Sequence, residues 1–297
     1  MYPMDYEEFR WATGDTATVP LLKRMFDSRK PLGEAHRKLM RDLRLYMLVG
    51  GMPQAVNEYL NTNNLQKVDA VKREILALYE TDLMKLDPTG RLSVLFNAIP
   101  AQLEKNASRY QITNVSENAK NDDYAPLIGL LKQSKAALVS YHCDDPNVGL
   151  ARTEDLNKYK IYVCDTGLFV TLAFKDKDFT ENVIYNKLLA DKLSVSLGYV
   201  YENLIAQMLA ALGDELFYHT FPTESGKHYY EVDFLLSRHN KLCPVEVKSS
   251  GYKSHKSLDV FCGKFSDRIL NKYLMYTKDY KRVEDLTCLP AYMTMFL

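Results

Sequence analysis

The sequence predicts a multidomain α+β protein built from three consecutive segments. Helical periodicity fills residues 1–90, three short helical stretches and two strand-like stretches fill residues 91–180, and helices alternate with strands in residues 181–297. The chain has 297 residues, of which 46% are hydrophobic, so it can bury a sizeable core. At about 100–200 residues per domain, this length suits two or three folded units.

The first segment is predicted to be helical because apolar residues recur at helical spacing. This spacing is present in residues 32–49 and again in residues 69–86. Gly50, Gly51 and Pro53 interrupt the pattern, as a helix end followed by a turn should. We therefore expect a helical region with a G-G-x-P turn between its helices.

The second segment has the element order of a winged helix-turn-helix. Helical stretches at 91–106, 112–120 and 123–138 precede two strand-like stretches at 137–142 and 158–169. A third helix followed by a two-stranded ribbon is the arrangement in which such units bind DNA. The DNA-contacting candidates stand near the end of that helix, at Lys132, Gln133 and Lys135. Small helical units with a hairpin also serve as packing or dimerisation modules, so a homo-oligomer is the alternative.

The third segment is predicted to be an α/β sandwich. A long amphipathic helix spans residues 194–212, and three strand-like stretches, another helix and two further apolar stretches follow it. The strand-like stretches cover 215–221, 229–238 and 242–250; the second helix covers 256–267, and the last two stretches cover 271–277 and 289–297. This α-β-β-β-α-β order favours a mixed fold over a helical bundle.

Charge and composition exclude several classes of protein. The 38 basic and 38 acidic side chains cancel, which argues against a strongly basic nucleic-acid coat and against an acidic disordered tail. No apolar stretch approaches the ~20 residues of a membrane span, and the N-terminus lacks a signal-peptide pattern. Five dispersed cysteines without a C-x-x-C motif argue against disulfides and zinc fingers. We expect a cytoplasmic protein with no membrane partner.

Three charged residues of the third segment are predicted to converge. Glu246 and Lys248 are two apart in a strand-like stretch, so both side chains leave the same face of the sheet. Asp233 lies in the preceding strand-like stretch, at a distance that suits a hairpin between the two strands. Two converging carboxylates repel each other unless a cation neutralises them, and Mg²⁺ or Mn²⁺ with its preference for oxygen ligands would do so. Asp233 and Glu246 are therefore the metal-binding candidates.

Such a site could hydrolyse a phosphodiester. A bound metal polarises the phosphate and lowers the pKa of a water molecule, while Lys248 could orient that water and offset charge on phosphorus. Residues 248–282 carry nine Lys or Arg against three Asp, although the whole chain is neutral, and this flank suits a polyanion such as DNA. The alternative is that the Glu246–Lys248 pair is a solvated salt bridge on an edge strand.

These motifs resemble those of the PD-(D/E)XK nuclease superfamily, which has a restriction-endonuclease-like fold. The resemblance rests on three strings in the same order, namely GYVYENL, EVDFLL and PVEVKSS. It implies a G-x-x-x-E motif on a helix, here ending at Glu202, together with Asp233 and Glu246 as metal ligands and Lys248 as catalytic base or positioning residue. The resemblance thus implies four catalytic residues: Glu202, Asp233, Glu246 and Lys248.

The rest of the chain resembles the C-terminal portion of a group of prokaryotic AAA-type ATPases. The resemblance is carried by YPMDYEEFRWA, YMLVGGMPQAV, YETDLMKL and KIYVCDTGLF. It implies a helical region at 1–90 that follows an ATPase core, a winged-helix unit at 91–180 and a nuclease-like domain at 181–297. The G-x-x-x-x-G-K-[ST] loop of the ATPase core is absent, so we expect this chain not to bind or hydrolyse ATP. The alternative to a nuclease is a catalytically inactive DNA-binding, regulatory or assembly module.

Overall fold

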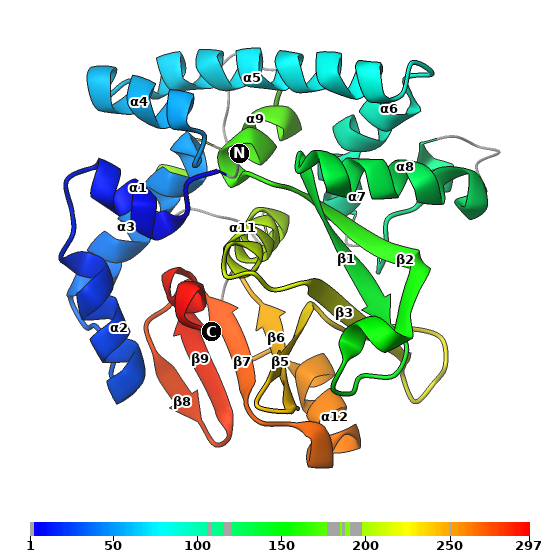
Figure 1. Cartoon of the computed structure of the whole chain (residues 1–297). Helices are drawn as coiled ribbons and strands as arrows, with labels where there is room; N and C mark the ends of the chain where they lie inside the picture. The colour runs from blue at the N-terminus through cyan, green and yellow to red at the C-terminus, as the bar shows by residue number, and fades with distance from the viewer. Residues whose placement is uncertain are drawn as a thin grey trace.

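The computed structural model in Figure 1 confirms a mixed α+β architecture, with helices gathered in the N-terminal part and two mixed β-sheets. It describes residues 3–105, 108–115, 120–176, 185, 188–190, 198–249 and 251–297. Within these residues, no helix has both the length and the apolar character that crossing a membrane requires.

The N-terminal helices begin and end where the sequence supplies capping residues. The Asp5 side chain accepts a hydrogen bond from the backbone of Glu8, whose side chain accepts one from the backbone of Asp5 in return, and Asn64 caps the longest helix. Gly50 ends the third helix with φ of 83°, a conformation that favours glycine. The five helices are α1 (Tyr6–Ala12), α2 (Thr18–Ser28), α3 (Ala35–Val49), α4 (Pro53–Thr62) and α5 (Leu65–Leu86).

The middle of the chain contains short helices followed by a two-stranded ribbon. The helices are α6 (Arg91–Asn97), α7 (Ile99–Glu104), the 3-10 turn η1 (Ile112–Asn114) and α8 (Asn121–Ser134). The strands are β1 (Ala137–Cys143) and β2 (Glu154–Val163), with the short turn η2 (Leu150–Thr153) between them and α9 (Thr166–Ala173) after them. The helix predicted at 112–120 is only a 3-10 turn in its described part, and residues 116–119 lie outside the described residues.

The first sheet joins the predicted second and third segments. Its strand order is β2-β1-β3-β4, where β3 spans Leu216–Pro222 and β4 spans Tyr229–Val232. Strand β1 is antiparallel to β2 and parallel to β3, with Tyr141 opposite Phe217. The ribbon predicted as a wing therefore continues into strands that lie beyond residue 180.

The second sheet has five strands in the order β5-β6-β7-β9-β8. They are β5 (Phe234–Arg238), β6 (Lys241–Val247), β7 (Lys272–Tyr276), β8 (Lys281–Val283) and β9 (Leu286–Pro290), and α12 (Lys256–Lys264) connects β6 to β7. The predicted hairpin is confirmed, since Phe234 pairs with Val245 across antiparallel β5 and β6.

The single strand predicted at 229–238 is wrong, because the chain leaves β4 in one sheet at Asp233 and enters β5 in the other. The Asp233 side chain accepts the backbone N–H of Val247 at this break.

Helix α11 (Gly198–Ala211) lies between the helical part and the second sheet, as Figure 1 shows. Its residues from Tyr199 to Leu209 are all buried, and it contacts β2, β6, α9 and the C-terminal turn η6 (Ala291–Phe296). A continuous buried apolar cluster extends from Tyr6 to Met293 through this helix. Helix α11 therefore connects the elements that surround the candidate site.

Candidate functional site

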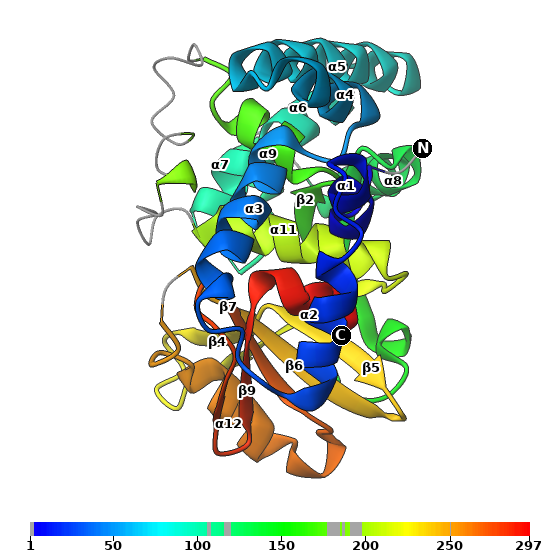
Figure 2. The same cartoon turned by 90° about the vertical axis from the view of Figure 1, so that its left-hand side faces the viewer.

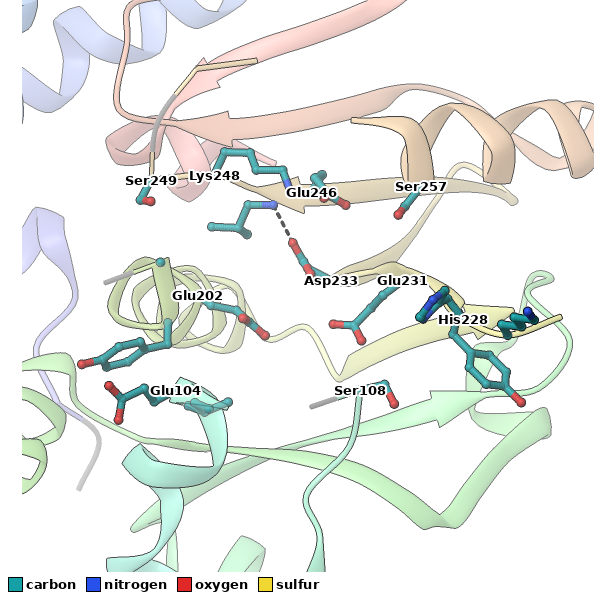
Figure 3. Close-up of a pocket in the computed structure, with 16 residues that line it drawn as sticks. Glu104, Ser108, Glu202, His228, Glu231, Asp233, Glu246, Lys248, Ser249 and Ser257 are labelled. Atoms are coloured by element: carbon teal, nitrogen blue, oxygen red, sulfur yellow. Dashed lines mark hydrogen bonds and ion pairs between the residues drawn. The ribbon is translucent and has the colours of Figure 1, made fainter. Parts of the chain in front are cut away.

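The four residues predicted to be catalytic line one pocket of about 710 Å³. Figure 3 shows that Glu202 comes from α11, Asp233 from the break between β4 and β5, and Glu246 and Lys248 from the end of β6. Other polar residues of the pocket include Glu104, Ser108, Glu231, Ser249 and Ser257. The structure thus brings together the four predicted side chains, which are up to 46 positions apart in the sequence.

Asp233 is held by the backbone of the neighbouring strand. Its Oδ2 accepts the N–H of Val247 at 2.7 Å, and this bond fixes the carboxylate beside the end of β6. Burial raises the pKa of Asp233 well above its ordinary value, and the negative charges of Glu246 and Glu202 raise it further. Without a cation, Asp233 therefore holds its proton more tightly than an exposed aspartate does.

Glu246 and Lys248 form an ion pair on one face of the sheet, as their spacing predicted. The Lys248 Nζ lies 2.5 Å from Glu246 Oε1. Burial raises the pKa of Glu246. Burial alone would lower the pKa of Lys248, but the charges of Glu246 and Asp233 raise it above its ordinary value. The second oxygen of Glu246, Oε2, is buried and has no hydrogen-bond partner among the described residues, so within them this carboxylate retains a free acceptor.

Glu202 is neutralised by a residue of the first sheet. Its Oε1 accepts hydrogen bonds from Lys160 Nζ at 2.8 Å and from the Tyr162 hydroxyl at 2.7 Å, both from β2. Burial would raise the pKa of Glu202, but Lys160 lowers it below its ordinary value. The same Lys160 ammonium lies 2.5 Å from Glu231 Oε1. Lys160 thus bridges two carboxylates, which Figure 3 shows pointing toward one another.

Sequence reasoning missed Lys160 and Glu231 as members of this cluster. Glu231 lies two residues before Asp233 in the EVDFLL string, and that period-2 spacing could have indicated it. Lys160 lies two residues before Tyr162, in the buried C-terminal half of β2, which is an unusual place for a lysine. Nothing local connects that strand to the third segment, because the connection depends on the parallel pairing of β1 with β3.

The oxygen-rich composition of the pocket suits a hard cation. Four carboxylates (Glu202, Glu231, Asp233 and Glu246) face two ammonium groups (Lys160 and Lys248), so the ionised cluster has an excess of two negative charges. The partnerless Oε2 of Glu246 and the nearby Asp233 are ligands of the type that Mg²⁺ accepts together with several waters. In the part of the chain that the structure describes, no group of three or more His, Cys, Asp or Glu is arranged to hold a metal ion. The pocket therefore offers a carboxylate pair rather than a full protein cage.

The residues predicted to contact DNA lie at the end of α8. Gln133 and Lys135 are exposed, and Lys135 ends the helix in the left-handed region with φ of 61°. The Lys132 ammonium lies 5.1 Å from the centre of the Tyr141 ring on β1. Helix α8 thus packs against the ribbon and leaves two of its three candidate residues accessible.

Comparison with known proteins identifies two domains of unknown function. Residues 40–178 match the family model DUF8612, and residues 197–292 match the family model DUF4143. The latter domain, in the C-terminal region, is often associated with AAA-type ATPases. Searches of curated proteins and of solved structures find no match to this chain.

Proposed function

We propose that this chain is the C-terminal part of an AAA-type ATPase and carries a metal-dependent phosphodiesterase site, of the PD-(D/E)XK nuclease-like kind, that acts on DNA. The observation that carries the proposal is the gathering of Glu202, Asp233, Glu246 and Lys248 in one pocket. The match of residues 197–292 to a domain often found with AAA-type ATPases supports the first part. The helix, hairpin, helix and parallel strand around the pocket support the nuclease-like part.

Each residue has a role that follows from its surroundings. Asp233 and Glu246 would hold Mg²⁺ or Mn²⁺, because they are neighbouring carboxylates and Glu246 keeps a free acceptor oxygen. The cation, when bound, supplies polarisation of the phosphate and a water of lowered pKa. Lys248, whose side chain is 30% exposed, can donate hydrogen bonds to a phosphate oxygen or orient the attacking water. Glu202 and Lys160 act as positioning residues that fix the floor of the pocket.

The ribbon and the short helices provide the DNA-docking part of the proposal. In a winged helix-turn-helix, a helix enters the major groove while neighbouring groups contact the phosphates. Helix α8 with exposed Gln133 and Lys135, next to the ribbon of β1 and β2, has the corresponding order of elements. We propose this helix as the duplex-contacting element.

Metal-dependent cleavage of DNA tests the proposal. Plasmid and branched DNA are incubated with the chain and Mg²⁺ or Mn²⁺, alongside the variants Asp233→Asn and Glu246→Gln, which keep the side-chain shape and remove charge. We expect cleavage by the unmodified chain and at least a 100-fold loss in both variants, since a site built on two metal ligands fails without either. Asp82→Asn, an exposed carboxylate of α5, is the control and should cleave normally. Cleavage that survives in both pocket variants would rule out this site.

The second candidate is a catalytically inactive module that binds DNA or a protein partner, or that assembles subunits. It is favoured by the ion pairs of the pocket, in which Lys248 is bonded to Glu246 and Lys160 to Glu202, so the charges are partly satisfied without a metal. This candidate predicts no cleavage with any divalent metal and unchanged DNA affinity in Asp233→Asn. The cleavage experiment therefore distinguishes the two candidates.

A further inference from the structure

A second pocket, of about 920 Å³, lies along α3 and is lined mainly by basic side chains. Four of its residues carry positive charge, one carries negative charge, and two are apolar. They are Arg37, Lys38, Arg41, Arg44, Glu34, Leu189 and Ala190, and we call this pocket the basic groove. The whole chain has no net charge, so this local excess is a property of the groove.

The spacing of the basic residues places them on one side of α3. Residues 37, 41 and 44 are separated by four and three positions, which are neighbouring positions on a helical face. The opposite face is apolar, and Leu39, Leu43 and Met47 are buried there. Arg37, Lys38 and Arg41 are exposed, and the described residues offer none of them an ion pair. Within the described part of the chain, these three charges therefore have no carboxylate at ion-pair distance.

A chain of hydrogen bonds connects the start of α3 to the rim of the catalytic pocket. The His36 ring hydrogen-bonds with the Thr277 carbonyl oxygen at 3.1 Å, and the Thr277 hydroxyl donates to the Ser249 carbonyl oxygen at 3.3 Å. Ser249 lines the pocket that contains Lys248. Figure 2 shows α3 crossing the face of the molecule next to α11, with one end near β7. These bonds thus link the start of α3, the helix that carries the basic groove, to a residue that lines the candidate pocket.

We infer that the basic groove binds the sugar-phosphate backbone of the nucleic acid whose phosphodiester enters the catalytic pocket. This inference rests on the proposed function and deepens it. From residue 37 to residue 41, the span of the exposed charges, the helix rises about 6 Å, which matches about two successive phosphates of a strand at 3.4 Å each. Guanidinium groups bind phosphate through two parallel hydrogen bonds, and two of the three exposed residues are arginines. A row of this length fits a linear polyanion better than a single small anion.

The test removes the three exposed charges of the groove from the full chain. The groove variant is Arg37→Gln, Lys38→Gln and Arg41→Gln together. The matched control is Arg24→Gln, Lys67→Gln and Lys241→Gln, which removes three exposed charges that also lack ion pairs with described residues. Binding of fluorescein-labelled single-stranded and duplex DNA is measured by anisotropy between low and moderate salt, without divalent metal. Polyglutamate and phosphatidylserine vesicles serve as alternative anionic ligands.

We expect the groove variant to bind DNA roughly 10- to 100-fold more weakly at about 0.1 M salt, with the slope of log K against log salt reduced by about 2–3. The control variant should keep the affinity and slope of the unmodified chain. Equal losses in both variants, unchanged binding in the groove variant, or no DNA binding at all would overturn the inference. Groove-dependent binding of polyglutamate or vesicles in preference to DNA would also overturn it.

The same measurements separate this inference from the proposed function. If the unmodified chain binds DNA through the groove but cleaves no DNA with any metal, the inference about the groove is upheld and the phosphodiesterase proposal fails. If the chain cleaves DNA and the groove variant binds and cleaves like the unmodified chain, the groove fails and the phosphodiesterase proposal stands. Asp233→Asn should retain the DNA affinity of the unmodified chain, because it lies outside the groove.

Discussion

The ionisable side chains of the candidate pocket are not equivalent, because each has different charged neighbours. Lys160 is buried between Glu202 and Glu231, and these charges raise its pKa although burial alone would lower it. The Lys160–Glu202 pair therefore stays ionised, whereas Asp233 forms no ion pair with the described residues and accepts a hydrogen bond from a backbone N–H. Asp233, whose negative charge is the least neutralised by neighbouring cations, is thus one of the two proposed metal ligands. A cation would relieve this burial cost, as metal sites commonly do.

The raised pKa of Asp233 predicts a pH-dependent stability. The folded chain binds a proton on Asp233 at pH values where the unfolded chain, with an aspartate pKa of about 3.9, has lost it. The free energy of unfolding should therefore fall as the pH rises above about 4, until it passes the raised pKa. The substitution Asp233→Asn removes this pH-dependent loss of unfolding free energy, and the amide oxygen of the new side chain can still accept the Val247 N–H. We expect the variant to be more stable than the unmodified chain at pH 8 by about 1 kcal/mol or more, and the gain to shrink at pH 5.

Urea denaturation at both pH values, without divalent metal, measures this effect. The exposed Asp82→Asn serves as the control and should show no pH-dependent gain. The metal supplies a second measurement, because a cation competes with the proton on Asp233. Mn²⁺ affinity of the unmodified chain should rise with pH, by at most about tenfold per pH unit. An Asp233→Asn variant that is destabilised more at pH 8 than at pH 5 would contradict the assignment.

At the scale of elements, a tight joint holds the end of α3, the start of α9 and the N-terminal segment together. Asp165 caps α9 by accepting the Leu168 N–H, and its other oxygen accepts the Gly51 N–H at 2.5 Å. The Gly51 carbonyl accepts the Met4 N–H at 2.7 Å. Lys72 of α5 donates to the Leu48 carbonyl, near the end of α3, and to the Gly167 carbonyl. These contacts satisfy backbone groups that helix ends leave without partners.

The joint predicts opposite effects of one substitution at two helical glycines. A Cβ at Gly167 would lie 2.5 Å from the Gly50 Cα, so Gly167→Ala must displace backbone and should cost about 3 kcal/mol of unfolding free energy. Gly129 of α8 has nothing within 4 Å of its Cβ position, so Gly129→Ala should stabilise by about 0.5–1 kcal/mol. Both residues are helical, and only packing distinguishes them. Urea denaturation of the two variants measures the change in unfolding free energy. A change of the same sign in both variants would contradict the close packing described at Gly167.

The elements that sequence predicted best are those with strong local signals. The G-G-x-P turn, the hairpin of β5 and β6 and the shared face of Glu246 and Lys248 follow from short-range patterns, and the structure confirms them. The break at Asp233 was missed because β4 and β5 form one uninterrupted apolar alternation, and only their partners in different sheets separate them. The contact of Gly51 with Asp165 joins residues 114 positions apart, which no local pattern indicates.

At the scale of the whole molecule, the first sheet and the candidate pocket both contain residues from before and after residue 180. Strand β1 pairs with β3, and Lys160 of β2 neutralises Glu202 of α11 and Glu231 of β4. Local periodicity could predict the strands but not this pairing, because parallel strands far apart in sequence leave no signature in either one. The charge balance of the candidate pocket in the C-terminal segment therefore depends on a lysine supplied by the preceding segment.

This dependence predicts that residues 181–297 do not fold alone. Without β1, strand β3 becomes an edge with unpaired backbone groups, and without Lys160 the carboxylates of Glu202 and Glu231 lose their shared cation. We expect the isolated fragment to lack a cooperative thermal transition by circular dichroism and to bind Mn²⁺ at least tenfold more weakly than the full chain.

Coexpression with residues 1–180 is the matched control, since it restores β1 and Lys160 without restoring the peptide bond. We expect the two fragments to copurify and to recover the transition. A fragment that unfolds cooperatively on its own and binds Mn²⁺ like the full chain would show that the first sheet and Lys160 are dispensable for the pocket.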